Sequence, residues 1–126
     1  MKMNKSNCEK AEMLVEVLPY VNRFRDKIIV IKYGGNAMIN EDLKKAVMQD
    51  LLLMKSVGMH PILVHGGGPA INDMLKKLKV ESHFEQGLRV TDKETMEIVE
   101  MVLAGKVNKD IVGTLNQIGG KGIGLS

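Results

Sequence analysis

The chain has 126 residues, of which 44% are hydrophobic and 26% are charged, a composition typical of one globular domain. Its net charge of +3 is spread along the sequence and aromatic residues make up only 3%, which argues against a nucleic-acid-binding surface. No apolar run approaches the roughly 20 residues of a membrane-spanning helix, and no export signal follows the N-terminus. The single cysteine, Cys8, rules out an internal disulfide. We therefore expect a cytoplasmic protein that binds neither nucleic acid nor a membrane.

An amphipathic helix is predicted over residues 9–24. Its apolar residues recur at helical spacing: Met13, Leu14, Val17, Leu18 and Val21. Pro19 should kink or split this helix, since proline removes one hydrogen bond and clashes with the preceding turn. Two roles stay open, because the helix either packs on its own domain or reaches out to another subunit.

Two apolar, β-branched runs each end in glycines. The first, IIVIKYGGNA at residues 28–37, places Lys32 just before Gly34 and Gly35. The second, PILVHGGGPA at residues 61–70, continues through Gly66, Gly67 and Gly68 to Pro69, a residue that suits the first position of a helix. Glycines and a helix N-terminus leave backbone N–H groups open to an anion. Each unit is therefore predicted to be a strand followed by an anion-binding loop.

The segment between these runs is predicted to be a crossover helix, capped by Asn40 and ended by Gly58. Its expected buried stripe is Leu43, Val47, Leu51 and Met54. A right-handed crossover makes the two strands parallel and brings both glycine loops to one edge of the sheet, facing one crevice. A phosphate or carboxylate site is the favoured interpretation, and two plain strand-to-helix turns are the alternative. Neither loop matches the Walker A or dinucleotide-binding pattern.

The second half of the chain predicts a hairpin and then helices. Residues 80–91 turn near Gln86 and Gly87. Thr91 and Glu94 form a capping-box pattern ahead of a helix that is expected to bury Met96, Val99 and Leu103. Gly105 should interrupt that helix before a second helical run, with Val107, Ile111, Leu115 and Ile118 on its buried face. Residues 123–126 then look like the start of a buried strand.

Three side chains are candidates for chemistry. Lys32 ends an apolar strand, so its ammonium must emerge at the loop, where it could neutralise a transferring phosphoryl group. Arg89 could grip a carboxylate with two parallel bonds, although a surface ion pair with Asp92 or Glu85 is the alternative. His65 is better explained as a hydrogen-bonded structural histidine than as a base or ligand, and no metal site is predicted.

IIVIKYGGNA, PILVHGGGPAINDML and QGLRVTD, in this order and spacing, resemble the amino-acid kinase family and, within it, the acetylglutamate kinases. The resemblance covers residues 27–126 and implies an open, mostly parallel sheet in an α/β/α sandwich, with residues 1–26 as an N-terminal extension helix. It implies phosphoryl transfer from ATP, with Mg²⁺, to the side-chain carboxylate of N-acetyl-L-glutamate in arginine biosynthesis. An ionised carboxylate needs no general base, which agrees with the absence of one.

The resemblance also implies roles for individual residues. Lys32 resembles the lysine that stabilises the transferring phosphoryl group, beside a phosphate loop of Gly34, Gly35 and Gly66. Gly67 and Gly68 resemble the glycines that contact the substrate. Arg89 resembles the arginine that holds a carboxylate of acetylglutamate. The N-terminal helix resembles one that links dimers into arginine-inhibited hexamers, so a homo-oligomer is expected, either a dimer or such a hexamer.

Family members continue into a nucleotide-binding C-terminal lobe that supplies further phosphoryl-facing residues, and nothing in residues 1–126 matches that lobe. We therefore expect an N-terminal portion with no meaningful turnover by itself. A non-catalytic module that binds acyl amino acids or assembles subunits, and a different kinase of the same family, remain alternatives.

Overall fold

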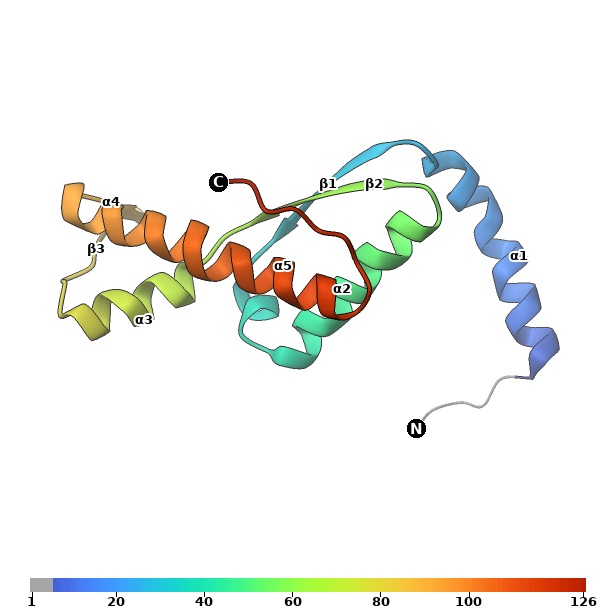
Figure 1. The fold of residues 1–126 in the computed structure, drawn as a ribbon, viewed down its shortest axis with the longest axis horizontal. Coiled ribbons are helices and arrows are strands. Elements are labelled where there is room, and N and C mark those ends of the chain that lie inside the picture. The colour runs from blue at the N-terminus through green and yellow to red at the C-terminus, as the bar shows by residue number, and fades with distance from the viewer. Residues whose placement is uncertain (1–5) are drawn as a thin grey trace.

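The computed structural model describes residues 6–126. Its first helix, α1 (Asn7–Phe24), opens with a capping box in which the Glu9 amide donates to Ser6 Oγ at 3.3 Å and the Ser6 amide donates to Glu9 Oε2 at 2.6 Å. The helix is continuous through Pro19, so of the predicted kink or split the split is wrong: one missing bond leaves the rest of an 18-residue ladder in place. None of its residues is buried, and α1 leads away from the other helices (Figure 1).

The predicted parallel strand pair is confirmed. Strands β1 (Ile28–Tyr33) and β2 (His60–His65) pair in register from Ile28 opposite His60 to Tyr33 opposite His65. The crossover runs through a 3₁₀ turn, η1 (Gly35–Met38), and helix α2 (Glu41–Ser56). Asn40 caps α2 as predicted, because its Oδ1 accepts from the amides of Asp42 at 2.9 Å and Leu43 at 3.0 Å. The chain thus has an α/β fold.

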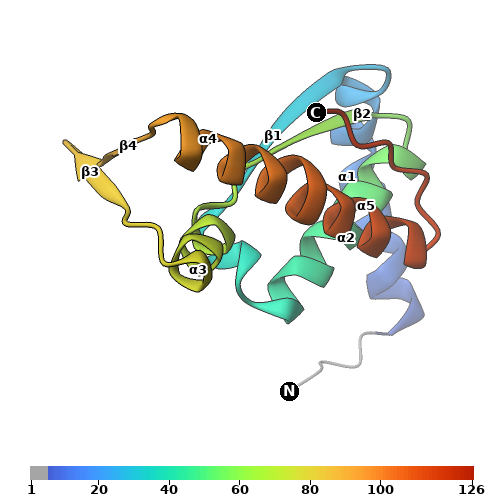
Figure 2. The same ribbon diagram turned by 60° about the vertical axis from the view of Figure 1, so that its left-hand side comes forward.

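Helices cover one face of this strand pair. Ile31, Tyr33 and Leu63 pack into a core that is centred on the fully buried side chains of Met48, Leu75 and Val102. Alternate residues on the strands face the other way and stay 49–69% exposed: Ile28, Val30, Ile62 and Val64. Figures 1 and 2 show α2 and the last helix side by side beneath the strands.

The buried stripe of α2 differs from the predicted one. Its buried residues are Lys44, Met48 and Leu51, whereas Leu43 is 48% exposed. Leu51 is buried as predicted and Val47 packs against the core, but Lys44 and Met48 are buried in addition to the predicted residues. The helix turns toward Asp110, which pairs with the ammonium of Lys44.

The second glycine loop leads into α3 (Gly68–Leu78), which has Pro69 in its first turn as predicted. The predicted hairpin follows as β3 (His83–Glu85) and β4 (Leu88–Val90), which pair antiparallel. Its turn residues, Gln86 and Gly87, have φ values of 49° and 81°. Two positive φ values in a two-residue loop match the twist of a hairpin.

One long helical segment follows, made of α4 (Lys93–Glu100), a π-helical stretch η2 (Met101–Val107) and α5 (Asn108–Gln117). The predicted interruption of the helix at Gly105 is therefore wrong. Gly105 lies in the π-helical stretch, whose Val102 and Val107 are buried in the core. Packing of these neighbours holds the chain helical despite the glycine.

Two finer predictions for this half are wrong, and a third is right only in part. The N-cap of α4 is Asp92 rather than Thr91, and Asp92 Oδ1 accepts from the Thr95 amide at 2.8 Å. Of the predicted buried face, Val99 and Leu103 pack against the core, but Met96 is 56% exposed. The most buried residues of α4 are Thr95 and Ile98. Residues 123–126 form no strand; the segment returns beside α5 toward β2 (Figures 1 and 2) and is held by side-chain contacts.

Candidate functional site

The two glycine loops lie side by side at the carboxyl ends of β1 and β2. The Gly66 amide donates to the Tyr33 carbonyl at 2.9 Å, which ties the start of the second loop to the end of β1. The shared edge predicted from the crossover is therefore present. Backbone N–H groups from two loops are gathered in one place, the arrangement that an anionic group requires.

The first loop is closed by the buried side chain of Tyr33, whose hydroxyl donates to the Ala37 carbonyl at 2.9 Å. Gly35 has a φ of 63°, which explains why this position suits glycine. Burial, together with the nearby carboxylates of Asp110 and Glu41, raises the pKa of the Tyr33 phenol, although the charge of Lys44 opposes this. The phenol thus stays a hydrogen-bond donor at neutral pH.

Lys32 precedes Tyr33 and lies on the opposite face of β1, because successive side chains of a strand alternate. Its side chain is exposed on the face shared with Ile28 and Val30. The structure thus brings Lys32 to the edge where both glycine loops begin, but Lys32 does not line the cleft described below.

Gly67 is the buried member of the second loop and the N-cap of α3. A Cβ added there would lie 2.5 Å from Leu103 Cδ2 and 3.4 Å from Val107 Cγ2. The π-helical stretch therefore packs directly on this glycine. The close approach explains why the middle residue of the three glycines has no side chain.

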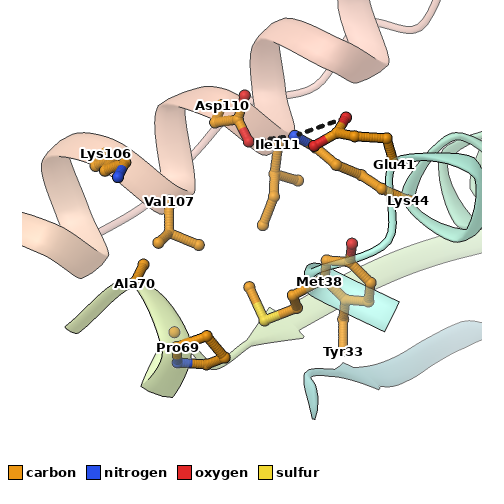
Figure 3. A pocket seen from close by; sticks show the side chains of 11 residues that line it. Tyr33, Met38, Glu41, Lys44, Pro69, Ala70, Lys106, Val107, Asp110 and Ile111 are labelled. Atoms are coloured by element: carbon orange, nitrogen blue, oxygen red, sulfur yellow. Dashed lines mark hydrogen bonds and ion pairs between the residues drawn. The ribbon is translucent and has the colours of Figure 1, made fainter. Parts of the chain in front are cut away.

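A cleft of about 250 Å³ opens between four parts of the chain: the C-terminal end of β1, the first turn of α2, the first turn of α3 and the junction of η2 with α5 (Figure 3). Met38, Pro69 and Val107 give it apolar walls, and Gly67 contributes backbone. Its charged lining residues are Glu41, Lys44, Lys106 and Asp110. This mixture of apolar walls with a few polar groups is typical of small-molecule sites.

Lys44 and Asp110 form an ion pair at this cleft, and Glu41 Oε2 lies 3.9 Å from Lys44 Nζ (Figure 3). Burial opposes the charge of Lys44, but the hydrogen bond to Asp110 and the nearby carboxylates outweigh it, so the pKa of Lys44 is raised. Sequence reasoning missed this pair. The only signal was a lysine in phase with Met48 and Leu51, and its partner is 66 residues away.

Arg89 lies on β4, apart from the residues that line the cleft. Its guanidinium donates to Ser82 Oγ and to Asn72 Oδ1, and its Cζ lies 4.6 Å from the centroid of the Phe84 ring. These partners are neutral, so the alternative of an ion pair with Asp92 or Glu85 is not what residues 6–126 show. The arginine is held over the first turns of α3.

His65 is hydrogen-bonded, as predicted for a structural histidine. Its Nδ1 lies 2.9 Å from the Gly66 carbonyl oxygen and its Nε2 lies 3.4 Å from Asn108 Nδ2. Among the described residues no three His, Cys, Asp or Glu side chains gather as a metal site. Over the same part of the chain, no helix combines the length and apolarity needed to cross a bilayer.

A parallel strand pair with a crossover helix and two glycine loops at its carboxyl edge places the chain among the α/β proteins that build ligand sites at strand ends. Residues 27–126 match the sequence profile of the amino acid kinase family. The chain belongs to this family, and its fold is the amino-acid kinase fold.

Curated relatives agree with this assignment. The chain is 63% identical over 117 residues to the acetylglutamate kinase of Heliobacterium modesticaldum, an alignment that covers 93% of this chain and 40% of the relative. It is 63% identical over 118 residues to the acetylglutamate kinase of Pelotomaculum thermopropionicum, covering 94% and 40%. The chain thus spans about 40% of the length of the curated relatives it matches.

Solved structures show the same fold. The crystal structure of smu.665 from Streptococcus mutans UA159 superposes with a TM-score of 0.63 at 35% identity, covering 73% of this chain and 37% of that one. N-acetylglutamate synthase from Neisseria gonorrhoeae superposes with a TM-score of 0.64 at 20% identity, covering 90% and 24%. The second likeness concerns the fold alone.

Proposed function

We propose that this chain forms the acetylglutamate-binding portion of an acetylglutamate kinase. The complete enzyme would transfer the γ-phosphoryl group of ATP to the side-chain carboxylate of N-acetyl-L-glutamate, giving an acyl phosphate in cytoplasmic arginine biosynthesis. The observation that carries the proposal is the meeting of two glycine loops at one sheet edge, with Gly66 bonded to Tyr33, in a chain 63% identical to named acetylglutamate kinases.

The acceptor needs no base from the protein, because its carboxylate is already ionised near neutral pH. Catalysis then depends on bringing two anions together and neutralising their charge. In this proposal Gly34 and Gly35 offer backbone N–H groups to phosphate oxygens, and Lys32 offers its ammonium to the transferring group. The N–H of Gly66, the third glycine of the proposed phosphate loop, is bonded to the Tyr33 carbonyl, so Gly66 contributes space for the phosphates rather than a hydrogen bond. No side chain crowds these three glycines, since an added Cβ at each would meet nothing within 4 Å.

ATP is the second substrate in this proposal, and Mg²⁺ would accompany it. The described residues hold no cluster of carboxylates for the metal, so the phosphates themselves and residues outside this chain would supply its ligands. In this proposal the chain contributes to ATP binding through the backbone of its glycine loops and the ammonium of Lys32.

Gly67, Gly68 and Arg89 are proposed to bind the acyl amino acid. Ser82, Asn72 and the Phe84 ring hold the guanidinium of Arg89 in place before any ligand arrives. A preordered guanidinium loses little freedom on binding and can form two charge-assisted bonds to the α-carboxylate.

Helix α1 is proposed to mediate association into a homo-oligomer, a dimer or a hexamer, with arginine as a feedback inhibitor of the assembly. Leu14 is 71% exposed, Val15 is 65% exposed and Leu18 is 52% exposed. An 18-residue helix with such side chains and no buried residue has an apolar surface suited to another subunit.

Isothermal titration of the chain with N-acetyl-L-glutamate tests the binding role. We expect saturable binding that L-glutamate and L-aspartate do not reproduce. Arg89→Ala should weaken it by about 10- to 100-fold, as expected when bonds to a charged group are lost. Arg23→Ala, which removes an exposed arginine of α1, is the matched control and should bind as the wild type does. Equal affinities for all three ligands, or an unaffected Arg89→Ala, would contradict the proposal.

A further inference from the structure

A hydrogen-bond network lies beside the second glycine loop, among residues that line a hollow separate from the cleft. His65, the last residue of β2, contacts the Gly66 carbonyl oxygen through Nδ1 at 2.9 Å. Its Nε2 lies 3.4 Å from Nδ2 of Asn108, the first residue of α5, which is only 7% exposed. Neither side chain lines the cleft.

The orientation of the Asn108 amide is fixed by two other contacts. Its Nδ2 donates to the Leu125 carbonyl at 3.2 Å, and its Oδ1 accepts from Lys109 Nζ at 3.3 Å. A carbonyl only accepts and an ammonium only donates, so a flipped amide would lose both bonds. Asn108 Nδ2 is therefore a donor toward His65, and His65 Nε2 must accept.

The protonation of His65 follows from this. A neutral imidazole carries one hydrogen, and if Nε2 accepts from Asn108 the hydrogen must be on Nδ1. Nδ1–H then donates to the Gly66 carbonyl, which only accepts. The network is consistent in one tautomer alone, and Asn108 selects it.

The Gly66 carbonyl and the Gly67 N–H belong to one peptide unit. In a trans peptide these two groups point in opposite directions, and the described residues contain no cis peptide. Gly67 lines the cleft, whereas His65 lines a separate hollow together with Asn108 and Leu103. Holding the carbonyl on the His65 side therefore turns the Gly67 N–H toward the cleft.

We propose that His65 and Asn108 are positioning residues for the substrate-facing Gly66–Gly67 peptide: Asn108 selects the Nδ1–H tautomer of His65, and that tautomer aims the Gly67 N–H at the acyl amino acid. The consequence for binding rests on the proposed function. The tautomer of His65 does not depend on the proposed function, because it can be observed without any ligand.

The first test is a long-range ¹H–¹⁵N spectrum of the unliganded chain at alkaline pH, where imidazole is neutral. His65→Asn identifies the His65 signals by their disappearance, among those of three histidines. We expect the pattern of an Nδ1–H imidazole, converted toward Nε2–H in Asn108→Leu. An Nε2–H pattern in the wild type would overturn the proposal.

The second test compares two polar replacements of His65 by titration with N-acetyl-L-glutamate. The amide of asparagine can occupy the position of Nδ1 and donate to the Gly66 carbonyl, whereas the amide of glutamine reaches the position of Nε2. We expect His65→Asn to retain wild-type affinity and His65→Gln to lose about tenfold, the effect of one displaced hydrogen bond to a charged ligand. Equal affinities for the two variants would refute a positioning role.

Circular dichroism and urea midpoints show whether each variant is folded. If Asn108→Leu does not fold, the affinities of His65→Asn and His65→Gln still test the positioning role. Absence of binding by the folded wild type would refute the proposed function. In that case the tautomer spectrum still decides whether Asn108 sets the state of His65, so the two failures are distinguishable.

Discussion

The Lys44–Asp110 ion pair has unequal partners, and this predicts unequal costs for removing each one. The Lys44 side chain is 10% exposed, whereas the Asp110 side chain is 57% exposed. Lys44→Met leaves a carboxylate that water can solvate, and methionine retains most of the packing of the lysine stem. Asp110→Asn leaves a largely buried ammonium whose remaining carboxylate, Glu41, is 3.9 Å away.

We expect Lys44→Met to lower the free energy of unfolding by about 1 kcal/mol, near the value of exposed pairs. Asp110→Asn should cost about 2 kcal/mol, part of the way to the 3–5 kcal/mol of a fully buried unpaired charge. The double variant should resemble Lys44→Met, because no unpaired ammonium remains. The two single effects would then fail to add by about 2 kcal/mol.

Urea unfolding at neutral pH measures these differences, provided that the m-values agree among the variants. The Lys44 pKa is raised in the folded chain, so this stabilisation is fully present below the ordinary lysine pKa and is lost as pH rises through the folded value. The difference in free energy of unfolding between wild type and Lys44→Met should therefore narrow in strongly alkaline solution, where Lys44 loses its proton.

The exposed pair of Lys77 and Asp73, at 2.7 Å, is the matched control. Its side chains are 64% and 50% exposed, so Lys77→Met should change stability by less than about 0.5 kcal/mol. The reasoning is refuted if Lys44→Met costs as much as Asp110→Asn, or if the effects of the two variants simply add.

Two further predictions concern helix α1 and the N-cap of α4. Removing residues 1–24 should reduce the assembled mass measured by light scattering, because α1 carries the exposed apolar side chains proposed to join subunits; an unchanged mass would contradict that role. The amide and hydroxyl of Thr95 lower the pKa of Asp92, so its charge stabilises the fold above the ordinary aspartate pKa and that stabilisation is lost as pH falls through the folded value. Asp92→Asn keeps a capping oxygen but removes the charge, so the difference in stability between it and the wild type should disappear in acid. A difference that does not change with pH would show that the charge of Asp92 is not its cause.

The strands and loops were predictable because their signals are local. Apolar β-branched runs that end in glycines gave β1, β2 and both loops, and Gln86–Gly87 gave the hairpin turn, since each depends on the conformations of a few neighbouring residues. The crossover rule then placed the loops at one edge. Every candidate site residue of the glycine loops came from this kind of reasoning.

The errors share a different cause. Periodicity gives the spacing of a buried stripe but not its centre, which is set by whatever packs against the helix. Lys44 is buried because Asp110 is opposite it, and α4 turns Thr95 inward where Met96 was expected. Gly105 remains helical because its neighbours are held in the core. Residues 123–126 form no strand because neither strand pair of the described residues extends to them, and the Leu125 carbonyl accepts from Asn108 Nδ2 instead.

The sequence by itself determined the α/β class, the two glycine loops and the residues beside them, because strand, turn and cap preferences act over a few residues. Only the tertiary structure decided that Lys44 pairs with Asp110 at the cleft, that Leu103 packs on Gly67, and that Asn108 meets His65 across 43 residues. Those contacts depend on how helices rotate and approach one another, and rotation is settled by packing the whole core at once rather than by any local pattern.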